Sequence, residues 1–210
     1  MYKFPIIVFE GVEGSGKSFH LKNIKKYFKK KKIKYLSFRE PGGSKNAEKI
    51  RKLILNKKSK FNNLTDLLLY LAARNENFHN ILSKHYKRKV ILIDRFTDST
   101  IAYQGYGHGI NKKALKQLQQ FIAGNIEPDM TIILDLPIKV GLERAEKRMK
   151  TQINAKKNNE DRYERMNIDF HERLRKGFLS IAKNNLKRCV VIDTTRSIEE
   201  IQTTIEQLDT

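Results

Sequence analysis

The chain has 210 residues and a mass of 24.6 kDa, which suits a single α/β domain with a sizeable core. It carries 43 Lys and Arg against 23 Asp and Glu, a net charge of +20, so nucleic-acid binding has to be weighed as a function class. The one cysteine, Cys189, excludes an internal disulfide framework and fits a reducing compartment. There is no apolar segment of the signal-peptide kind at the N-terminus and no long apolar run, so we expect a soluble, cytoplasmic protein without a membrane partner.

The basic residues are spread along the whole chain, in short runs at 29–32, 57–58, 112–113 and 156–157. None of these runs is interleaved with aromatic residues, as a stacking surface for single-stranded nucleic acid would be. The pattern favours lysines on solvated faces, so no nucleic-acid partner is expected.

A glycine-rich segment directly follows the apolar run 4–9, which is typical of a buried strand. It matches G-x-x-x-x-G-K-[ST] at every specified position and reads Gly11-Val12-Glu13-Gly14-Ser15-Gly16-Lys17-Ser18. Apolar residues at helical spacing come next, so the segment joins a strand to a helix. In that setting the backbone N–H groups surround a phosphate, Lys17 reaches the β- and γ-phosphates and the Ser18 hydroxyl is a ligand of Mg²⁺. The alternative, a glycine-rich turn without function, fits the full match less well, and we expect a nucleoside triphosphate site.

A second short strand is predicted at 35–38, and Arg39 follows it. The carboxyl ends of strands in an α/β sheet are where ligands bind, so Arg39 is a candidate for an anion. After a loop at 40–44, helices are predicted at 45–56 and at 62–86. Tyr70 and Arg74 are four residues apart in the longer helix and share a face.

A third strand at 90–93 ends in Asp94 and Arg95. A carboxylate at this place holds Mg²⁺ or its water in P-loop enzymes, and the Arg is placed for a second anionic group. The polar segment 96–105 could contact a base or a sugar, or it could simply cap a helix. A helix at 112–123 and a fourth strand at 130–134 follow, with Asp135 as a weaker metal candidate.

From 140 onward a helix carries Arg144 and Arg148 on one face and is predicted to end in a polar stretch at 150–159. A polar segment without apolar periodicity is typical of a mobile lid, which excludes water during phosphoryl transfer, or of a surface loop. A helix, a strand at 189–192 and a final helix complete the pattern. We therefore expect one domain over 1–210, with a lid at about 147–160.

Six segments, in this order, are similar to those of thymidylate kinases of the bacterial type, a family of P-loop nucleoside monophosphate kinases. They are 9–13, Arg39-Glu40-Pro41-Gly42-Gly43, 67–74, 94–105, 128–131 and Asp161-Arg162-Tyr163-Glu164. The resemblance implies a three-layer α/β/α fold with a five-stranded parallel sheet, a homodimer, and transfer of the γ-phosphate of ATP to dTMP with Mg²⁺. Such an enzyme makes dTDP for dTTP supply to DNA synthesis.

The resemblance also implies roles for single residues at the matching positions. Glu13 would lie near the sugar 3′-hydroxyl, and Arg39 and Arg95 would hold the acceptor phosphate. The base and sugar contacts would come from Tyr70, Arg74, Thr100, Tyr103 and Gln104, and Tyr163 and Glu164 would close over the acceptor. Lys17, Arg95 and Asp94 are catalytic candidates, with Ser18 and Asp94 as metal ligands.

One position departs from part of the family, because the variable P-loop residues Val12, Glu13, Gly14 and Ser15 include no Arg. The catalytic Arg is then expected from the lid, with Arg148 the first choice and Arg144 against the adenine. Three alternatives stay open: a kinase for another nucleotide, a nucleic-acid-dependent P-loop ATPase, and a slow regulatory ATP switch.

Overall fold

The computed structural model describes residues 4–124, 126–153, 162–163 and 165–208, with the backbone alone for 148–153. Five strands form one sheet, and their bounds are β1 Ile6–Gly11, β2 Tyr35–Arg39, β3 Val90–Asp94, β4 Met130–Asp135 and β5 Cys189–Asp193. All neighbours are parallel, in the order β2-β3-β1-β4-β5. The five-stranded parallel sheet predicted from the sequence is confirmed.

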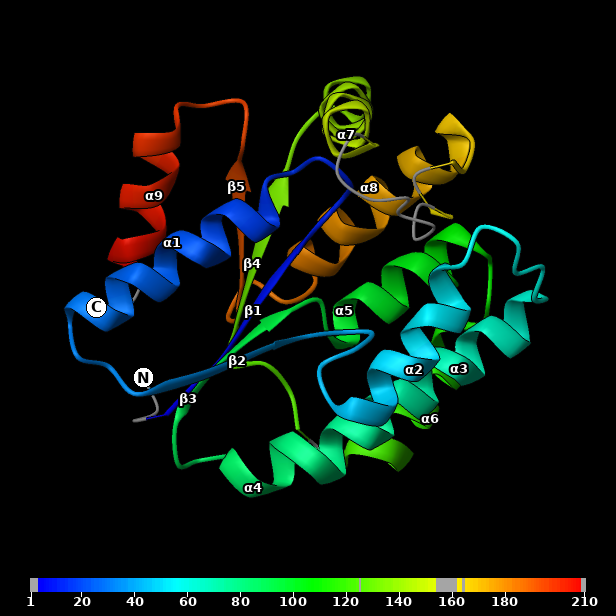
Figure 1. The fold of residues 1–210 in the computed structure, drawn as a ribbon, viewed down its shortest axis with the longest axis horizontal. Coiled ribbons are helices and arrows are strands. Elements are labelled where there is room, and N and C mark those ends of the chain that lie inside the picture. Colours follow the sequence, from blue (N-terminus) through cyan, green and yellow to red (C-terminus); the bar gives the residue numbers. More distant parts are fainter. Residues whose placement is uncertain (1–3, 125, 154–161, 164, 209–210) are drawn as a thin grey trace.

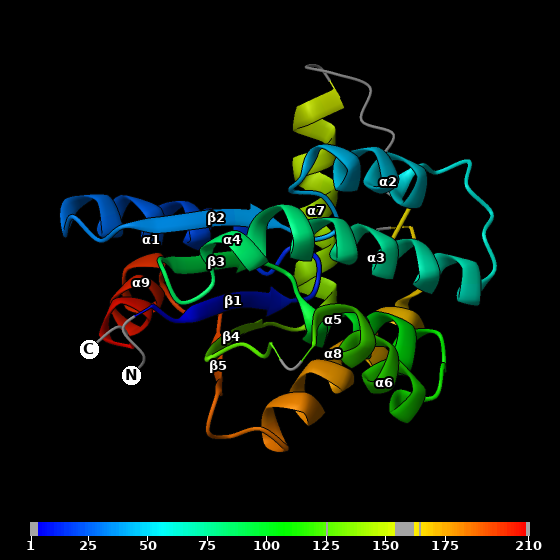
Figure 2. The same cartoon turned by 90° about the horizontal axis from the view of Figure 1, so that it is seen from below.

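Helices cover both faces of this sheet (Figures 1 and 2). Their bounds are α1 Lys17–Lys30, α2 Lys45–Leu55, α3 Asn63–Asn77, α4 Ser83–His85, α5 Thr97–Thr100, α6 Lys112–Ala123, α7 Ile138–Ile153, α8 Ile168–Lys183 and α9 Ile198–Gln207. Two π-helical segments, η1 Phe78–Leu82 and η2 Ile101–Gly107, continue α3 and α5. Among the described residues, none of the helices has the length and apolarity needed to cross a membrane.

Alternate residues of the central strands pack on opposite faces of the sheet, as the twofold repeat of a strand requires. Ile7 and Phe9 of β1 lie in the cluster with α1 and α9, whereas Ile6 and Val8 face the other way, toward Leu82. Because both faces are covered, the strands are apolar runs rather than alternating ones. The polar residues that follow them therefore gather at the carboxyl edge of the sheet.

Polar side chains cap the N-termini of several helices. Asn62, Asn111 and Asn167 each accept a hydrogen bond from a first-turn N–H, and Ser197 and Glu200 form a capping box. These caps fix where α3, α6, α8 and α9 begin.

Two segments differ from the sequence prediction, and a third was left open by it. The expected helix 62–86 contains the π-helical turn η1. The polar segment 96–105, for which the sequence predicted no conformation, is helical through α5 and η2. Helix α7 continues to Ile153, beyond the predicted loss of helix at 150, because Lys and Gln are good helix formers even without an apolar face.

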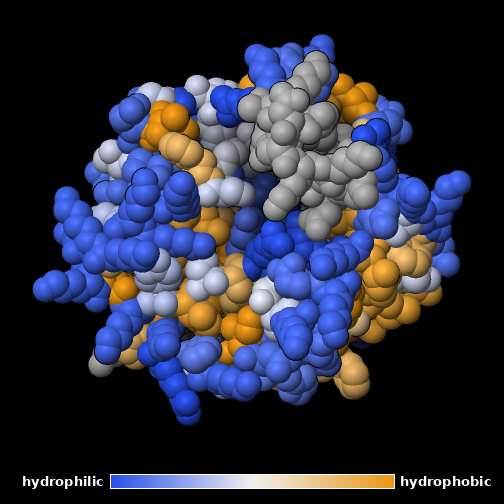
Figure 3. Space-filling model, in the orientation of Figure 1, coloured by the Kyte–Doolittle hydropathy of each residue, from blue (hydrophilic) through white to orange (hydrophobic). Residues whose placement is uncertain are grey.

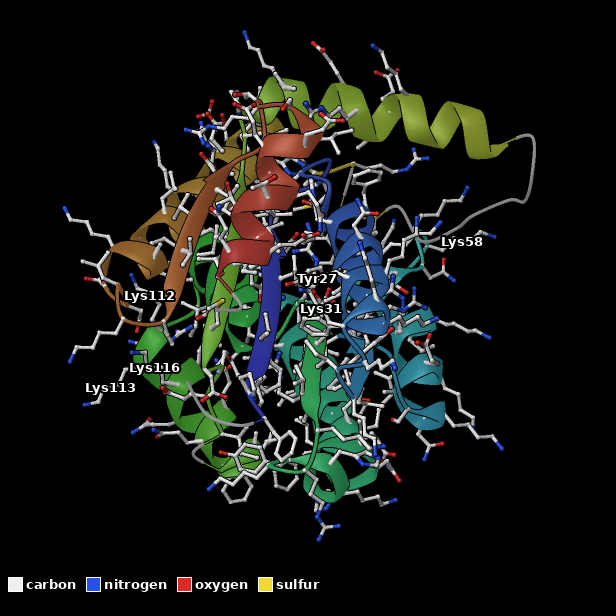
Figure 4. The ribbon with its side chains drawn as sticks, turned by 90° about the vertical axis from the view of Figure 1, so that its left-hand side faces the viewer. Tyr27, Lys31, Lys58, Lys112, Lys113 and Lys116 are labelled. Atoms are coloured by element: carbon white, nitrogen blue, oxygen red, sulfur yellow. The ribbon has the colours of Figure 1, made fainter. Side chains whose placement is uncertain are left out.

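The lysines lie on separate parts of the surface. Lys112, Lys113 and Lys116 are on α6 and point outward on one side of the molecule, whereas Lys31 and Lys58 are on other elements (Figure 4). Hydrophilic residues cover most of the face in Figure 3 rather than one stripe. This distribution agrees with the sequence interpretation of lysines on solvated faces.

Candidate active site

The loop between β1 and α1 places a helix N-terminus at the carboxyl edge of the sheet. Gly14 and Gly16 have φ values of 73° and 86°, in the left-handed region that favours glycine. Gly14 also lies against α7, where an added Cβ would be 2.0 Å from the carbonyl oxygen of Gly141. Because the N-cap Gly16 has no side chain to satisfy the first amides of α1, these N–H groups are available to an anion.

The Lys17 ammonium lies over this loop. Its Nζ donates to the carbonyl oxygens of Gly11 at 2.8 Å and Val12 at 2.9 Å, and to Ser15 Oγ at 3.3 Å. Burial, together with the positive charge of Arg95, lowers the pKa of Lys17 to about 8. A polyanion bound at the loop would favour the charged form of this side chain.

Arg95 follows β3 and reaches back to the P-loop. Its φ of 67° is left-handed, which is uncommon for a residue other than glycine. Nη1 donates to the Gly11 carbonyl at 3.0 Å, and Nη2 donates to Glu13 Oε1 at 3.0 Å. Tyr103 donates its hydroxyl to the same Glu13 oxygen at 2.6 Å, and the Arg95 guanidinium lies 5.0 Å from the centre of its ring. The P-loop, the residue after β3 and the segment η2 thus meet at the Glu13 carboxylate.

The other oxygen of Glu13, Oε2, is buried and lacks a hydrogen-bond partner among the described residues. His171 Nδ1 lies 3.9 Å away. Burial alone would raise the pKa of Glu13, but the charges of Arg95 and Lys17 hold the pKa below its usual value. An ionised carboxylate with one open oxygen can accept a hydrogen bond from a hydroxyl group.

Arg74 of α3 is a further side chain of the site and is almost fully buried. It pairs with Glu40 Oε2 through Nε at 2.7 Å, and Nη1 donates to Thr100 Oγ1 at 2.9 Å and to Gln119 Oε1 at 3.2 Å. Nη2 donates to the Phe96 carbonyl at 3.0 Å. These four bonds occupy four of its five N–H groups and hold the guanidinium in a fixed plane.

Aromatic rings of Tyr70, Tyr103 and Tyr163 form one wall of the site. The ring of Tyr163 is edge-on to Tyr70 and Tyr103, with centroid distances of 6.3 and 5.3 Å. Its hydroxyl donates to Asp66 of α3, which also accepts from Arg162 Nη1 at 2.6 Å. These bonds tie residues 162–163 to α3 and so fix the aromatic wall.

Two arginines lie at the edges of the site. Arg39 donates through Nε and Nη2 to the two oxygens of Glu48, at 3.3 and 3.0 Å. This pair is about half exposed, so little free energy opposes its exchange for another anion. On the other side Arg144 of α7 donates to the carbonyl oxygen of Thr194, after β5, at 3.4 Å.

Most of the predicted site residues line one cavity of about 490 Å³. They are Glu13, Gly14, Ser15, Gly16, Lys17, Ser18, Arg39, Tyr70, Arg74, Asp94, Arg95, Thr100, Tyr103, Gln104, Arg144 and Tyr163. Gly11 and Val12 of the loop are buried and do not line the cavity. Gln104 is a further candidate for ligand contact, because its Nε2 is buried without a hydrogen-bond partner in the described part of the chain.

Three predictions fall outside what the structure describes. The Arg148 side chain and all of Glu164 lie outside the described residues. Of the expected lid, residues 147–153 form the end of α7, and residues 154–160 lie outside the described residues.

Sequence reasoning assigned no role to two buried carboxylates. Glu10 and Glu40 are 0 and 5% exposed, and Glu40 holds Arg74. The available signal was position, since Glu10 ends an apolar strand and Glu40 precedes a Pro-Gly-Gly turn. Their partners were not predictable, because they lie far away along the chain.

Comparison with known proteins gave concordant matches. The family model described as thymidylate kinase matches residues 9–205. The thymidylate kinase of Geobacter sulfurreducens is 40% identical over 95% of this chain and 93% of its own, and that of Kosmotoga olearia is 37% identical over 93% and 90%. The crystal structure of thymidylate kinase from Ehrlichia chaffeensis superposes with a TM-score of 0.75 at 30% identity, over 97% of both chains.

Proposed function

The chain belongs to the thymidylate kinase family, and we propose that the cavity between the P-loop, α3 and η2 is where it transfers the γ-phosphate of ATP to dTMP. The products are ADP and dTDP. The observation that carries this assignment is that Glu13 joins the two halves of the cavity. The carboxylate belongs to the P-loop, and it bonds Arg95 and Tyr103 from the other side.

We call the part of the cavity lined by Arg39, Tyr70, Arg74, Arg95 and Tyr103 the acceptor half, and it fits a nucleoside monophosphate. Arg95 and Arg39 supply guanidinium groups for the phosphate, and the open oxygen of Glu13 accepts from the sugar 3′-hydroxyl. Tyr103 occupies the space beside the 2′ position. This arrangement predicts a preference for a deoxyribose.

The far end of the acceptor half fits thymine. Tyr70 offers a ring face to the base, and Arg74 has one remaining N–H for the base O4. Thr100 and Gln104 contact the other polar edge of the base, where the unpaired Gln104 amide gains a partner. A base without the matching carbonyl groups leaves these buried donors unpaired, which is how a polar site discriminates.

The donor half, which is lined by residues 14–18 of the P-loop and by Arg144, binds the triphosphate of ATP. The first N–H groups of α1 and the Lys17 ammonium bind its β- and γ-phosphates, and Arg144 lies against the adenine. Lys17 then exchanges the Gly11 and Val12 carbonyls for phosphate oxygens.

A magnesium ion fits the donor set of this half. Ser18 and Asp94 offer one hydroxyl and one carboxylate in the wall of the same cavity. The described residues contain no cluster of three or more His, Cys, Asp or Glu side chains. Mg²⁺ takes few protein ligands and keeps waters and phosphate oxygens, so Ser18 and Asp94 are a sufficient pair. When bound, the ion supplies charge neutralisation at the phosphates.

Catalysis follows from positioning and electrostatics. Arg95 and Arg39 fix the acceptor phosphate, Glu13 fixes the sugar, and the P-loop fixes the donor, so that the acceptor oxygen faces the γ-phosphate. Lys17 and Arg148 stabilise the charge that spreads over the transferred group. A lid at about 147–160, with Tyr163 and Glu164 beside it, closes over both substrates and excludes water, within a single domain over 1–210.

We also infer a homodimer, packed through α2, α3 and α6. Exposed apolar side chains gather on these neighbouring helices: Leu53, Leu64, Leu68 and Phe121, which are 51 to 89% exposed. Apolar residues collect at the right-hand edge of Figure 3, where Figure 1 places α2 and α3. A patch of this kind favours a protein partner, and closed symmetric dimers are the commonest assembly.

A cytoplasmic location stays a prediction, supported by the single buried thiol of Cys189. The proposed site is tested by a coupled assay of ADP release with ATP and Mg²⁺ across dTMP, dUMP, dCMP, dGMP and GMP. We expect fast turnover with dTMP and weaker turnover with dUMP. Turnover with another monophosphate would discard the thymine contacts, and turnover that needs DNA or RNA alone would assign the net charge of +20 a function.

A further inference from the structure

Glu10 is a fully buried carboxylate behind the P-loop. Its Oε1 accepts from the backbone N–H groups of Phe96 at 2.8 Å and Ser99 at 3.0 Å, and its Oε2 accepts from Ser99 Oγ at 2.5 Å. The N-cap of α5, Phe96, has no side chain that can make such bonds. Glu10 therefore caps α5 from a different strand of the sheet.

The same bonds reach Arg95. Ser99 Oγ gives its hydrogen to Glu10 and accepts from Arg95 Nη1 at 3.4 Å, so the carboxylate orients the hydroxyl toward the guanidinium. The Arg95 backbone is also held on both sides by β1, since Arg95 N donates to the Phe9 carbonyl at 3.0 Å and Phe96 N donates to Glu10. A left-handed arginine is kept in place only where its surroundings fix it.

We propose that Glu10, acting through Ser99, is a positioning residue for Arg95 and holds its guanidinium in the orientation that binds the acceptor phosphate. This inference rests on the proposed function, namely on Arg95 as a ligand of the dTMP phosphate. Glu10 itself touches no substrate, because it is 0% exposed and does not line the cavity.

A glutamate is an unfavourable choice if the role is only to cap a helix. Burial raises the pKa of Glu10 to about 7, against the opposing charge of Arg95, so the fold disfavours the ionised form. A glutamine has nearly the same shape and no charge to bury. If Glu10 has only a structural role, Glu10→Gln changes the stability of the fold and the activity together. If Glu10 positions Arg95, Glu10→Gln weakens the binding of dTMP and leaves the stability of the fold unchanged.

The test is steady-state kinetics with dTMP and ATP varied separately, together with melting temperatures. We expect Arg95→Ala to raise the dTMP KM about 100-fold, as for loss of a charge-assisted pair of hydrogen bonds. Glu10→Gln and Ser99→Ala each raise it about tenfold, with the ATP KM changed less than about twofold and the Tm of Glu10→Gln not lowered. The double variant is no worse than the stronger single variant, because the two residues act in one relay.

Asp98→Asn is the matched control. Asp98 is a buried carboxylate on the same turn, but it accepts from Arg188 Nη1 at 2.7 Å and Nη2 at 2.9 Å rather than serving Arg95. We expect this variant to lower Tm with little change in the dTMP KM.

The outcomes separate the inference from the proposed function. If Arg95→Ala raises the dTMP KM and Glu10→Gln does not, the positioning role is wrong and the site stands. If Arg95→Ala leaves the dTMP KM unchanged, both assignments fail. If Glu10→Gln behaves like the Asp98 control, the role is structural; should that variant not fold, Ser99→Ala decides by the same KM criterion.

Discussion

Tyr103 Oη lies 2.6 Å from Glu13 Oε1 and so couples η2 to the P-loop across the substrate cavity. The same oxygen accepts from Arg95, so loss of the Tyr103 hydroxyl leaves this oxygen with Arg95 as its one remaining partner of the two. A hydrogen bond to a charged group contributes about 1.5–3 kcal/mol. We expect Tyr103→Phe to lower kcat/KM for dTMP roughly tenfold, while the remaining ring still excludes ribonucleotides.

Tyr106→Phe is the control for this change. Tyr106 belongs to the same π-helical segment, but its hydroxyl donates to Ser180 Oγ at 2.7 Å and it does not line the cavity. Kinetics with dTMP and with its ribose counterpart distinguish the two variants. Equal kinetics for both would contradict a role for the bond between Tyr103 and Glu13.

Removal of the Lys17 ammonium tests the donor half of the site. We expect Lys17→Ala to lower kcat by roughly 10²–10³, as for the loss of one preorganised charge-stabilising group. Lys22→Ala is suited as control, because Lys22 is an exposed residue of the same helix. Near-full activity of the Lys17 variant would remove this residue from the mechanism.

The sequence predicted the cavity residues that follow strands, because the carboxyl ends of parallel strands meet at one edge. Arg39, Asp94 and Arg95 are cases of this kind, Lys17 was predicted from the glycine-rich motif, and the structure brings all four to one cavity. The partners of Glu10 could not be predicted. Glu10 accepts hydrogen bonds from Phe96 and Ser99, which are 86 and 89 positions further along the chain, and these bonds depend on β3 lying beside β1. The sequence also left the conformation of 97–107 open, since its Gly and hydroxyl residues are poor helix formers whose conformation is set by packing against α8.

The titration of Glu10 predicts a pH dependence of stability. Its pKa is about 7 in the folded chain, above the ordinary value of 4.5, so between these values the folded state holds a proton that the unfolded state has lost. Raising the pH through this window therefore favours unfolding. We expect the free energy of unfolding of the wild type to fall relative to that of Glu10→Gln between about pH 5 and pH 7.5. Urea denaturation of both proteins at four pH values measures the difference, and a constant difference would contradict the raised pKa.

The proposed dimer depends on apolar side chains of α3. Leu68 is 51% exposed on the outer face of this helix, and a charge there would be buried without a partner in a dimer. We expect Leu68→Glu to weaken the dimer at least tenfold in sedimentation equilibrium, as for several kcal/mol of desolvation. Leu186→Glu, at a residue that is 79% exposed between α8 and β5, should leave the association unchanged. A monomeric wild type would exclude the dimer.

The last prediction concerns the cation that acts on the transferred phosphate. Arg144 and Arg148 are one helical turn apart on α7, and Arg144 lies at the donor edge of the cavity. If Arg148 stabilises the transition state, Arg148→Ala lowers kcat and leaves the KM for dTMP nearly unchanged, because the lost contact forms only during transfer. Arg144→Ala serves as the matched variant and is expected to raise the ATP KM, since the proposed site places its guanidinium against the adenine. A rise in KM alone for Arg148→Ala would make Arg148 a binding residue and move the catalytic role to another cation of the lid.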